Sequence, residues 1–251
     1  LWGGFVRRII LILIILFCFP FNVLASENQP EVYAQGAVLM EYETGRVLWQ
    51  KNMNEELPMA STTKIMTAIL ALESGKLDET VTASKNAAVQ PKTRMGLSEG
   101  EQLKLKDLLY ALMLQSSNDA AVAIAEHVGG SVEAFCDMMD SKAKELGAVD
   151  TDFETPNGLD SGEHHSTAYD MALIACYALK NDEFKEIINT RQAEIKSDRC
   201  TYTIINKNRL LNEYDGAIGV KTGFTGKAGN CFVGAAQRDG MTLVSVVLGS
   251  G

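Results

Sequence analysis

The chain has 251 residues, of which 46% are hydrophobic, 22% charged and 7% aromatic. This composition excludes disordered, collagen-like and coiled-coil proteins and is typical of a globular one. The formal net charge of −9 predicts no nucleic-acid partner, because phosphate binding needs a basic face. The chain has 3 histidines and no HExxH motif, which argues against a histidine-rich metal enzyme.

Residues 1–25 have the pattern of a secretory signal peptide. Two arginines precede an apolar run over residues 9–19, and Ala25 is a small residue suited to cleavage. The run is shorter than the roughly 20 residues that a membrane-spanning helix needs, and an uncleaved anchor is the less favoured alternative. We therefore expect an exported protein whose mature part, residues 26–251, works at the outer face of the cell membrane or in the cell-wall space.

The cysteines of the mature part are far apart and form no CxxC pair, so we expect no zinc site. Export permits disulfides, which leaves one bridge open, but we favour buried thiols. These cysteines are Cys136, Cys176, Cys200 and Cys231.

The predicted elements begin with strands and continue with helices. Apolar runs over residues 36–42 and 46–50, on either side of Glu43-Thr44-Gly45, predict a β-hairpin. A capping-box pattern at Thr167 and Asp170 opens the last predicted helix. The predicted helices cover residues 61–72, 105–114, 119–128, 132–146 and 168–179.

Strands return at the C-terminal end, over residues 217–222, 230–236 and 241–248, with Asp239-Gly240 as the last turn. The order of strands, helices and strands predicts an α+β fold. Its antiparallel sheet combines the N-terminal and C-terminal strands and packs against the helical region. The last strand ends close to the final residue, so we expect the catalytic domain, residues 26–251, to lack a C-terminal part.

The first chemical motif is Ser61-Thr62-Thr63-Lys64, at the start of a predicted helix. Residues i and i+3 share a helix face, so the Lys64 amine can reach the Ser61 hydroxyl and accept its proton. This requires a lowered lysine pKa, through burial or through a second cation nearby. Ser141-Lys142-Ala143-Lys144 has the same spacing, but it lies in an amphipathic helix and is interpreted as a solvated face.

The second motif, Ser116-Ser117-Asn118, falls in a short break between two predicted helices, where a loop can project side chains into a cleft. Ser116 could relay a proton to a leaving amine, and Asn118 could bind a substrate amide and Lys64. By itself the motif is equally a polar helix cap.

The third motif, Lys221-Thr222-Gly223 followed by Phe224, ends a predicted strand. Glycine there leaves room for a substrate along the strand edge, and Lys221 and Thr222 could bind a carboxylate. An isolated copy of this motif would be a solvated strand end.

Together the three motifs resemble those of the serine penicillin-binding and β-lactamase superfamily. More specifically, the sequence resembles the D-alanyl-D-alanine carboxypeptidases among the low-molecular-mass penicillin-binding proteins, from about Ala34 onwards. The segments that carry this resemblance are residues 58–67, 116–120, 156–159, 165–172 and 219–225.

The resemblance implies a reaction without metal or cofactor. Ser61 would attack the bond between the two terminal D-alanines of a peptidoglycan stem pentapeptide, with Lys64 as the base and Ser116 as the proton donor to the leaving group. Asn118, Lys221, Thr222 and Gly223 would bind substrate. The backbone N–H groups of Ser61 and Phe224 would form the oxyanion hole.

The same resemblance implies partners. β-Lactam antibiotics would acylate Ser61. Family members usually continue into a helix on the sheet, a small β-rich domain and often a membrane-binding amphipathic helix, so we expect any membrane association to lie in a missing C-terminal segment.

Three other functions fit the sequence less well. A class A β-lactamase needs an ExxLN run between Asn118 and Lys221, and the sequence has none. A transpeptidase would use the same three motifs, usually in a larger chain. A scaffold that binds penicillin without catalysis is disfavoured by the intact motifs. We interpret His164-His165 as residues that order a loop.

Overall fold

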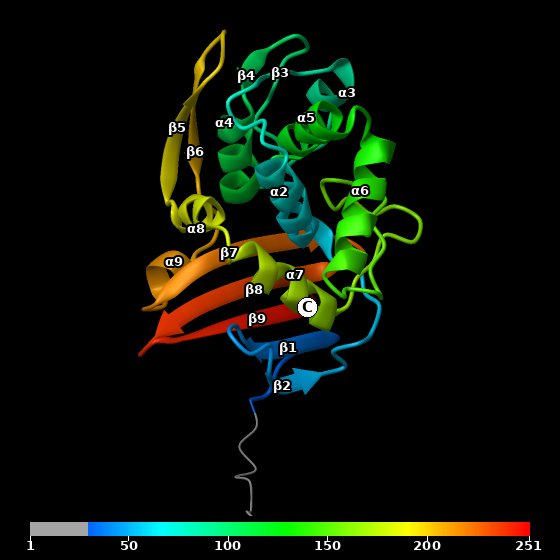
Figure 1. Cartoon of the computed structure of the whole chain (residues 1–251), viewed down its shortest axis with the longest axis vertical. Coiled ribbons are helices and arrows are strands. Elements are labelled where there is room, and N and C mark those ends of the chain that lie inside the picture. Colours follow the sequence, from blue (N-terminus) through cyan, green and yellow to red (C-terminus); the bar gives the residue numbers. More distant parts are fainter. Residues whose placement is uncertain (1–29) are drawn as a thin grey trace, which may run out of the picture. The chain divides into compact units, whose positions relative to one another are not determined.

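A five-stranded antiparallel sheet joins both ends of the part of the chain that the computed structural model describes, residues 30–251. The strand order is β2-β1-β9-β8-β7 (Figure 1), so the N-terminal hairpin pairs with the last strand and β7 forms an edge. The strands are β1 (Gly36–Glu41), β2 (Val47–Lys51), β7 (Ala217–Thr225), β8 (Gly229–Arg238) and β9 (Met241–Ser250). The predicted signal peptide lies outside the described residues.

From Val244 to Leu248, every second side chain of β9 is apolar and points to the same face of the sheet, and this face lies in the core. Val244, Val246 and Leu248 are fully buried, and each such side chain contributes about 1.5–3 kcal/mol by leaving water. At the turn from β8 to β9, Asp239 and Gly240 have φ angles of 48° and 78°. Positive φ at both positions is typical of the tight hairpin turn that this dipeptide predicts.

The helices lie along one side of the sheet (Figure 1), which confirms the predicted α+β arrangement. Helix α2 is central because its residues from Lys64 to Ala71 are all buried, and a helix that is apolar all round has to be enclosed. The helices are α2 (Lys64–Glu73), α3 (Lys85–Ala88), α4 (Leu105–Tyr110), α5 (Asn118–Gly129), α6 (Val132–Glu145), α7 (Ala168–Ala178), α8 (Asp182–Asn189) and α9 (Leu210–Glu213).

Two of the predicted helices are not α-helical over their whole length. The predicted helix 61–72 begins as a 3₁₀ turn, η1 (Ala60–Thr63), and becomes α-helical only at Lys64. The predicted helix 105–114 ends in a π-helical turn, η2 (Ala111–Gln115). π-helical turns are rare overall, and those that occur are often found at functional sites. This one leads directly into Ser116.

Sequence reasoning missed two small hairpins and the helices α3, α8 and α9. The first hairpin pairs β3 (Thr80–Thr82) with β4 (Gln102–Lys104), and the second pairs β5 (Gln192–Lys196) with β6 (Thr201–Ile205). Each of these four strands buries a single residue, so none repeats an apolar residue often enough to be recognised. One of the two hydrogen bonds of the predicted capping box is present: the Thr167 hydroxyl accepts from the Asp170 N–H at 3.0 Å.

The four cysteines of the described residues are free thiols, so the open alternative of a bridge is not realised. Three are buried, but Cys200 is exposed, and the preference for buried thiols is wrong there because Cys200 lies in the turn between β5 and β6.

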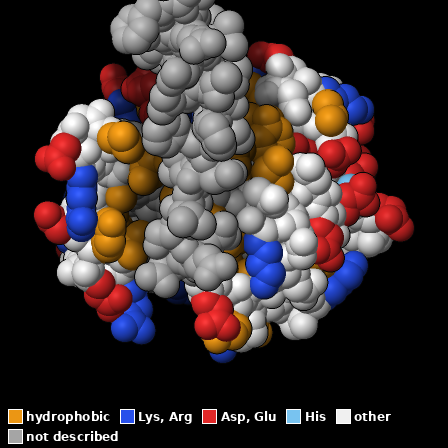
Figure 2. All heavy atoms as spheres, turned by 90° about the horizontal axis from the view of Figure 1, so that it is seen from below, with side chains coloured by type: hydrophobic (Ala, Val, Ile, Leu, Met, Phe, Trp, Pro, Cys, Tyr) orange, Lys and Arg blue, Asp and Glu red, His pale blue; other side chains and the backbone are white. Residues whose placement is uncertain are grey.

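Among residues 30–251 no helix is both long and apolar enough to cross a membrane. Figure 2 shows one face of the described residues, on which hydrophobic side chains lie among scattered acidic and basic ones.

Candidate active site

Ser61 and Lys64 are brought together at the junction of η1 and α2. The Lys64 Nζ atom lies 2.9 Å from the Ser61 Oγ atom, as the spacing of three residues predicts. Lys64 is fully buried while Ser61 is partly exposed. The serine hydroxyl therefore faces a cleft and the amine approaches it from inside the protein.

Three oxygen atoms surround the Lys64 amine. Besides Ser61 Oγ, it donates to Asn118 Oδ1 at 2.8 Å and to the backbone carbonyl of Asn157. Burial lowers the pKa of Lys64 well below its usual value, and the charges of Lys221 and Lys207 lower it further. The sequence left burial and a second cation as alternative causes, and the structure shows both. A neutral amine in this position can accept the Ser61 proton.

The Ser116-Ser117-Asn118 segment connects η2 to α5, in the predicted break between two helices. Ser116 has a φ of 66°, a left-handed conformation that turns the chain sharply after the π-helical turn. Asn118 opens α5, and its backbone N–H donates to the Thr93 carbonyl at 2.7 Å. The residues around Thr93 therefore form one rim of the cleft.

The Lys221-Thr222-Gly223 segment lies in the edge strand β7. Burial lowers the pKa of Lys221 to about 7, and the charge of Lys207 also lowers it. A Cβ atom on Gly223 would lie 2.9 Å from the Ser61 nitrogen, closer than such contacts occur. Glycine is required there so that β7 can pack against η1. Phe224 is 67% exposed beside the cleft.

The three motifs line one cavity of about 440 Å³. Ser61, Ser116, Thr222, Gly223 and Phe224 contribute from the predicted site, while Lys64, Asn118 and Lys221 are buried behind it. The cavity is completed by residues that sequence reasoning missed, namely Lys92, Thr93, Lys207 and Asn230. Lys207 follows β6 in a loop with no recognisable motif, so only its place in the fold reveals it.

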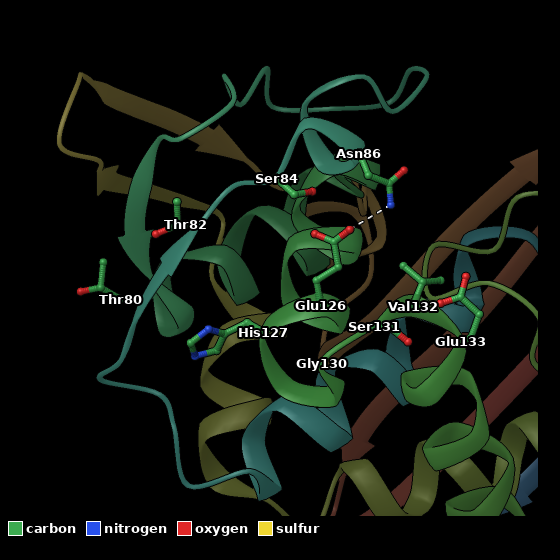
Figure 3. A pocket seen from close by; sticks show the side chains of 10 residues that line it. All are labelled: Thr80, Thr82, Ser84, Asn86, Glu126, His127, Gly130, Ser131, Val132 and Glu133. Atoms are coloured by element: carbon green, nitrogen blue, oxygen red, sulfur yellow. Dashed lines mark hydrogen bonds between the residues drawn. The ribbon is translucent and has the colours of Figure 1, made fainter.

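A larger hollow, of about 560 Å³, lies at the far end of α5 (Figure 3). Two of its titratable side chains already have partners: Glu126 accepts from Asn86 at 2.9 Å, and His127 lies 3.0 Å from Glu79. None of its lining residues is a lysine that could activate a serine. Within residues 30–251 no group of three or more His, Cys, Asp or Glu side chains could hold a metal ion. The cleft at Ser61 is therefore the candidate active site.

Comparisons with known proteins identify the family of the chain. The sequence profile of the D-alanyl-D-alanine carboxypeptidase family, peptidase S11, matches residues 24–251. The chain is 40% identical over 223 residues to D-alanyl-D-alanine carboxypeptidase DacF of Bacillus subtilis, covering 86% of this chain and 57% of that protein. It is 37% identical to DacB2 of Mycobacterium tuberculosis, covering 87% of this chain and 76% of that protein.

Solved structures show the same fold. A D-alanyl-D-alanine carboxypeptidase of Mycobacterium tuberculosis superposes with a TM-score of 0.87 at 35% identity, over 91% of this chain and 87% of that one. A Streptomyces DD-transpeptidase superposes with a TM-score of 0.84 at 34% identity, over 88% and 92%.

The chain spans only 57% and 62% of the first two curated relatives that it matches. The profile nevertheless covers the whole described region, and DacB2 is matched over most of its length. From the matched profile, these relatives and the shared fold, we conclude that the chain belongs to the D-alanyl-D-alanine carboxypeptidase family.

Proposed function

We propose that this chain is the catalytic domain of an exported serine D-alanyl-D-alanine carboxypeptidase. The observation that carries the proposal is the contact between the Lys64 amine and the Ser61 hydroxyl at 2.9 Å, with the pKa of Lys64 lowered well below normal by burial. A hydroxyl becomes a nucleophile when a neighbouring neutral base can take its proton. The relatives named above carry the same activity in their names.

In the proposed reaction the Ser61 oxygen attacks the carbonyl carbon between the two terminal D-alanines of a stem pentapeptide. The Ser61 proton moves to the Lys64 amine. The C–N bond then breaks, and the proton that Lys64 took returns through the Ser116 hydroxyl to the nitrogen of the departing D-alanine, with the new acyl ester left on Ser61. Water attacks this ester, which releases the shortened peptide and restores the serine. A positioned acid or base contributes about 10²–10⁴-fold to such a step.

The substrate would bind along the free edge of β7. A peptide laid beside an edge strand gains backbone hydrogen bonds, and Gly223 keeps that edge close to Ser61. Lys221 and Thr222 would hold the terminal carboxylate, and Lys207 adds a positive charge to the cleft. A bound carboxylate raises the pKa of a lysine beside it, so substrate would restore the charged form of Lys221.

The backbone N–H groups of Ser61 and Phe224 would form the oxyanion hole of this reaction. Donors of this kind stabilise the negative charge that develops on the carbonyl oxygen. Asn118 would bind the substrate amide while holding the Lys64 amine through its Oδ1 atom. β-Lactams would enter as substrate mimics and acylate Ser61, and the acyl group would leave slowly.

The proposed substrate places the protein outside the cytoplasm. Peptidoglycan stem peptides occur there, and the signal peptide predicted over residues 1–25 would provide export. The proposed partners are therefore stem peptides and β-lactams.

The test is D-alanine release from a synthetic peptide ending in D-Ala-D-Ala. We expect release by the native chain, and none by Ser61→Ala. Ser141→Ala is the matched control, because Ser141 belongs to the second SxxK sequence but is exposed on α6, and it should release D-alanine at the native rate. Folded native chain that releases no D-alanine would overturn the proposal. Adding an amine acceptor to the assay would show whether the acyl group is transferred rather than hydrolysed.

A further inference from the structure

His164 is buried beside η1, the 3₁₀ turn that contains Ser61, and does not line the cleft. Its side chain is 4% exposed, and its Nδ1 atom accepts the backbone N–H of Glu154 at 3.0 Å. Burial lowers the pKa of His164 to about 4, so the imidazole is neutral at pH 7. Because Nδ1 accepts, the single proton of the neutral ring sits on Nε2. The backbone thus fixes which nitrogen can donate.

The Nε2 proton is directed at Thr63. The His164 Nε2 atom lies 2.9 Å from the Thr63 hydroxyl, and that hydroxyl donates to the Ala60 carbonyl at 2.8 Å. Thr63 is fully buried, so no water competes for these bonds. The result is a directed chain of hydrogen bonds from the loop around His164, through Thr63, to the residue before Ser61.

Ala60 has a backbone conformation that needs such support. Its φ is 48°, which is left-handed and costs a residue with a Cβ roughly 1–2 kcal/mol. The Ala60 carbonyl and the Ser61 N–H belong to one planar peptide group and point in opposite directions. Holding the carbonyl towards Thr63 therefore directs the Ser61 N–H, a proposed oxyanion donor, away from Thr63.

Gly158 encloses the same carbonyl from another side. A Cβ atom at Gly158 would lie 1.9 Å from the Ala60 oxygen and 2.8 Å from the Thr63 Oγ1 atom. The backbone of this loop therefore packs directly against the Ala60 peptide. The neighbouring Asn157 carbonyl accepts from Lys64, so one loop restrains both the peptide before the nucleophile and the base.

We infer that His164 is a positioning residue for the reaction at Ser61: it acts through Thr63 to fix the peptide between Ala60 and Ser61. It touches neither Ser61 nor the cleft, and its contribution is geometric. The inference rests on the proposed function for its kinetic consequence, but the orientation of the Ser61 N–H can be observed without substrate. This role goes beyond ordering the loop, which is what the sequence predicts for the histidine pair.

The test compares Thr63→Val and His164→Leu, which remove the chain of hydrogen bonds, with Thr63→Ser and His164→Gln, which retain a hydroxyl or an N–H donor. The kinetic readout is the rate of Ser61 acylation by a fluorescent penicillin, with the thermal midpoint measured in parallel. We expect the first pair to acylate on the order of 10–100-fold more slowly, as small displacements of reacting groups do. The second pair should recover most of the rate.

His165→Gln is the matched control, because His165 is the adjacent histidine but pairs with Glu56 at the surface. It should acylate at the native rate. In the Thr63→Val background, replacing His164 with leucine should slow acylation no further, because both residues act through one hydroxyl. Additive effects, or native acylation in folded Thr63→Val and His164→Leu, would overturn the inference.

A second readout separates this inference from the proposed function. The amide resonance of Ser61 in a ¹⁵N–¹H spectrum should shift in Thr63→Val and His164→Leu and stay near its native position in His165→Gln. If native chain releases no D-alanine and yet this shift occurs, the proposed function fails and the positioning role stands. If the Ser61 resonance is unchanged in both variants, the positioning role fails, whatever the activity.

Discussion

The positive charge of Lys221 lowers the pKa of Lys64, although the two lysines come from opposite ends of the described chain, in β7 and at the start of α2. Burial has the larger effect on both, and Lys207 lowers both further. The fold thus places a lysine with a strongly lowered pKa against the Ser61 hydroxyl and a second lysine, which titrates near neutrality, behind the same cleft.

Replacing Lys207 with glutamine should raise the pKa of Lys64, because one repelling charge is removed. A base with a higher pKa needs a higher pH to lose its proton. The acidic limb of the pH profile of kcat/KM should therefore move to higher pH in Lys207→Gln.

This shift is measured with the D-Ala-D-Ala peptide across a pH series. The control is Lys180→Gln, because Lys180 is exposed after α7 and is not among the groups that alter the pKa of Lys64. An acidic limb that stays in place in Lys207→Gln would contradict the charge coupling.

The stability of the protein should rise with pH above neutrality, because Lys221 has a folded pKa of about 7 and an unfolded value of about 10.4. Between these values the unfolded chain binds more protons, so raising the pH favours the folded state. For this lysine the slope reaches about 1.4 kcal/mol per pH unit. Below pH 7 both states are protonated and the slope vanishes.

Urea unfolding at pH values from 6 to 9, with Lys221→Met alongside, measures this effect. The difference between the two proteins isolates Lys221 from other titrating groups, and Lys221→Met should show a flatter rise. Parallel pH dependences would mean that Lys221 keeps an ordinary pKa in the fold.

Gly223→Ala should impair acylation because its Cβ atom would lie 2.9 Å from the Ser61 nitrogen. Relieving this contact moves β7 away from η1, at a cost of about 1–3 kcal/mol for overpacking. Labelling with fluorescent penicillin and the thermal midpoint report the two effects. Gly226→Ala is the control, since a Cβ there meets no atom within 4 Å. Equal labelling of the two variants would refute the close-approach explanation.

Asp119→Asn should loosen the rim of the cleft. The carboxylate accepts the backbone N–H groups of Met95, Gly96 and Leu97 at 2.8–3.0 Å, and it is fully buried. An amide offers one acceptor oxygen where the carboxylate offers two, so unpaired N–H groups should cost about 1–3 kcal/mol. We expect lower stability in urea unfolding and slower acylation. Asp137→Asn, on the exposed face of α6, should change neither, and a similar loss in both variants would contradict the prediction.

Local geometry determined what the sequence could predict. The spacing of Ser61 and Lys64, the capping hydroxyl of Thr167 and the tight turn at Asp239-Gly240 each depend on a few consecutive residues, whose backbone geometry fixes their relative positions. The order of strands and helices was predicted for the same reason. The short strands β3 to β6 were not predicted, because a strand with one buried residue shows no hydrophobic periodicity.

Contacts between distant segments were decided only by the tertiary structure. Lys207 and Lys221 lower the pKa of Lys64, and His164 reaches Thr63, because β7 lies at the edge of the sheet and the loop around Asn157 packs against η1. The exposure of Cys200 follows likewise from a hairpin that the sequence did not predict. No spacing in the sequence encodes these contacts, since each depends on how separate elements pack around the buried helix α2.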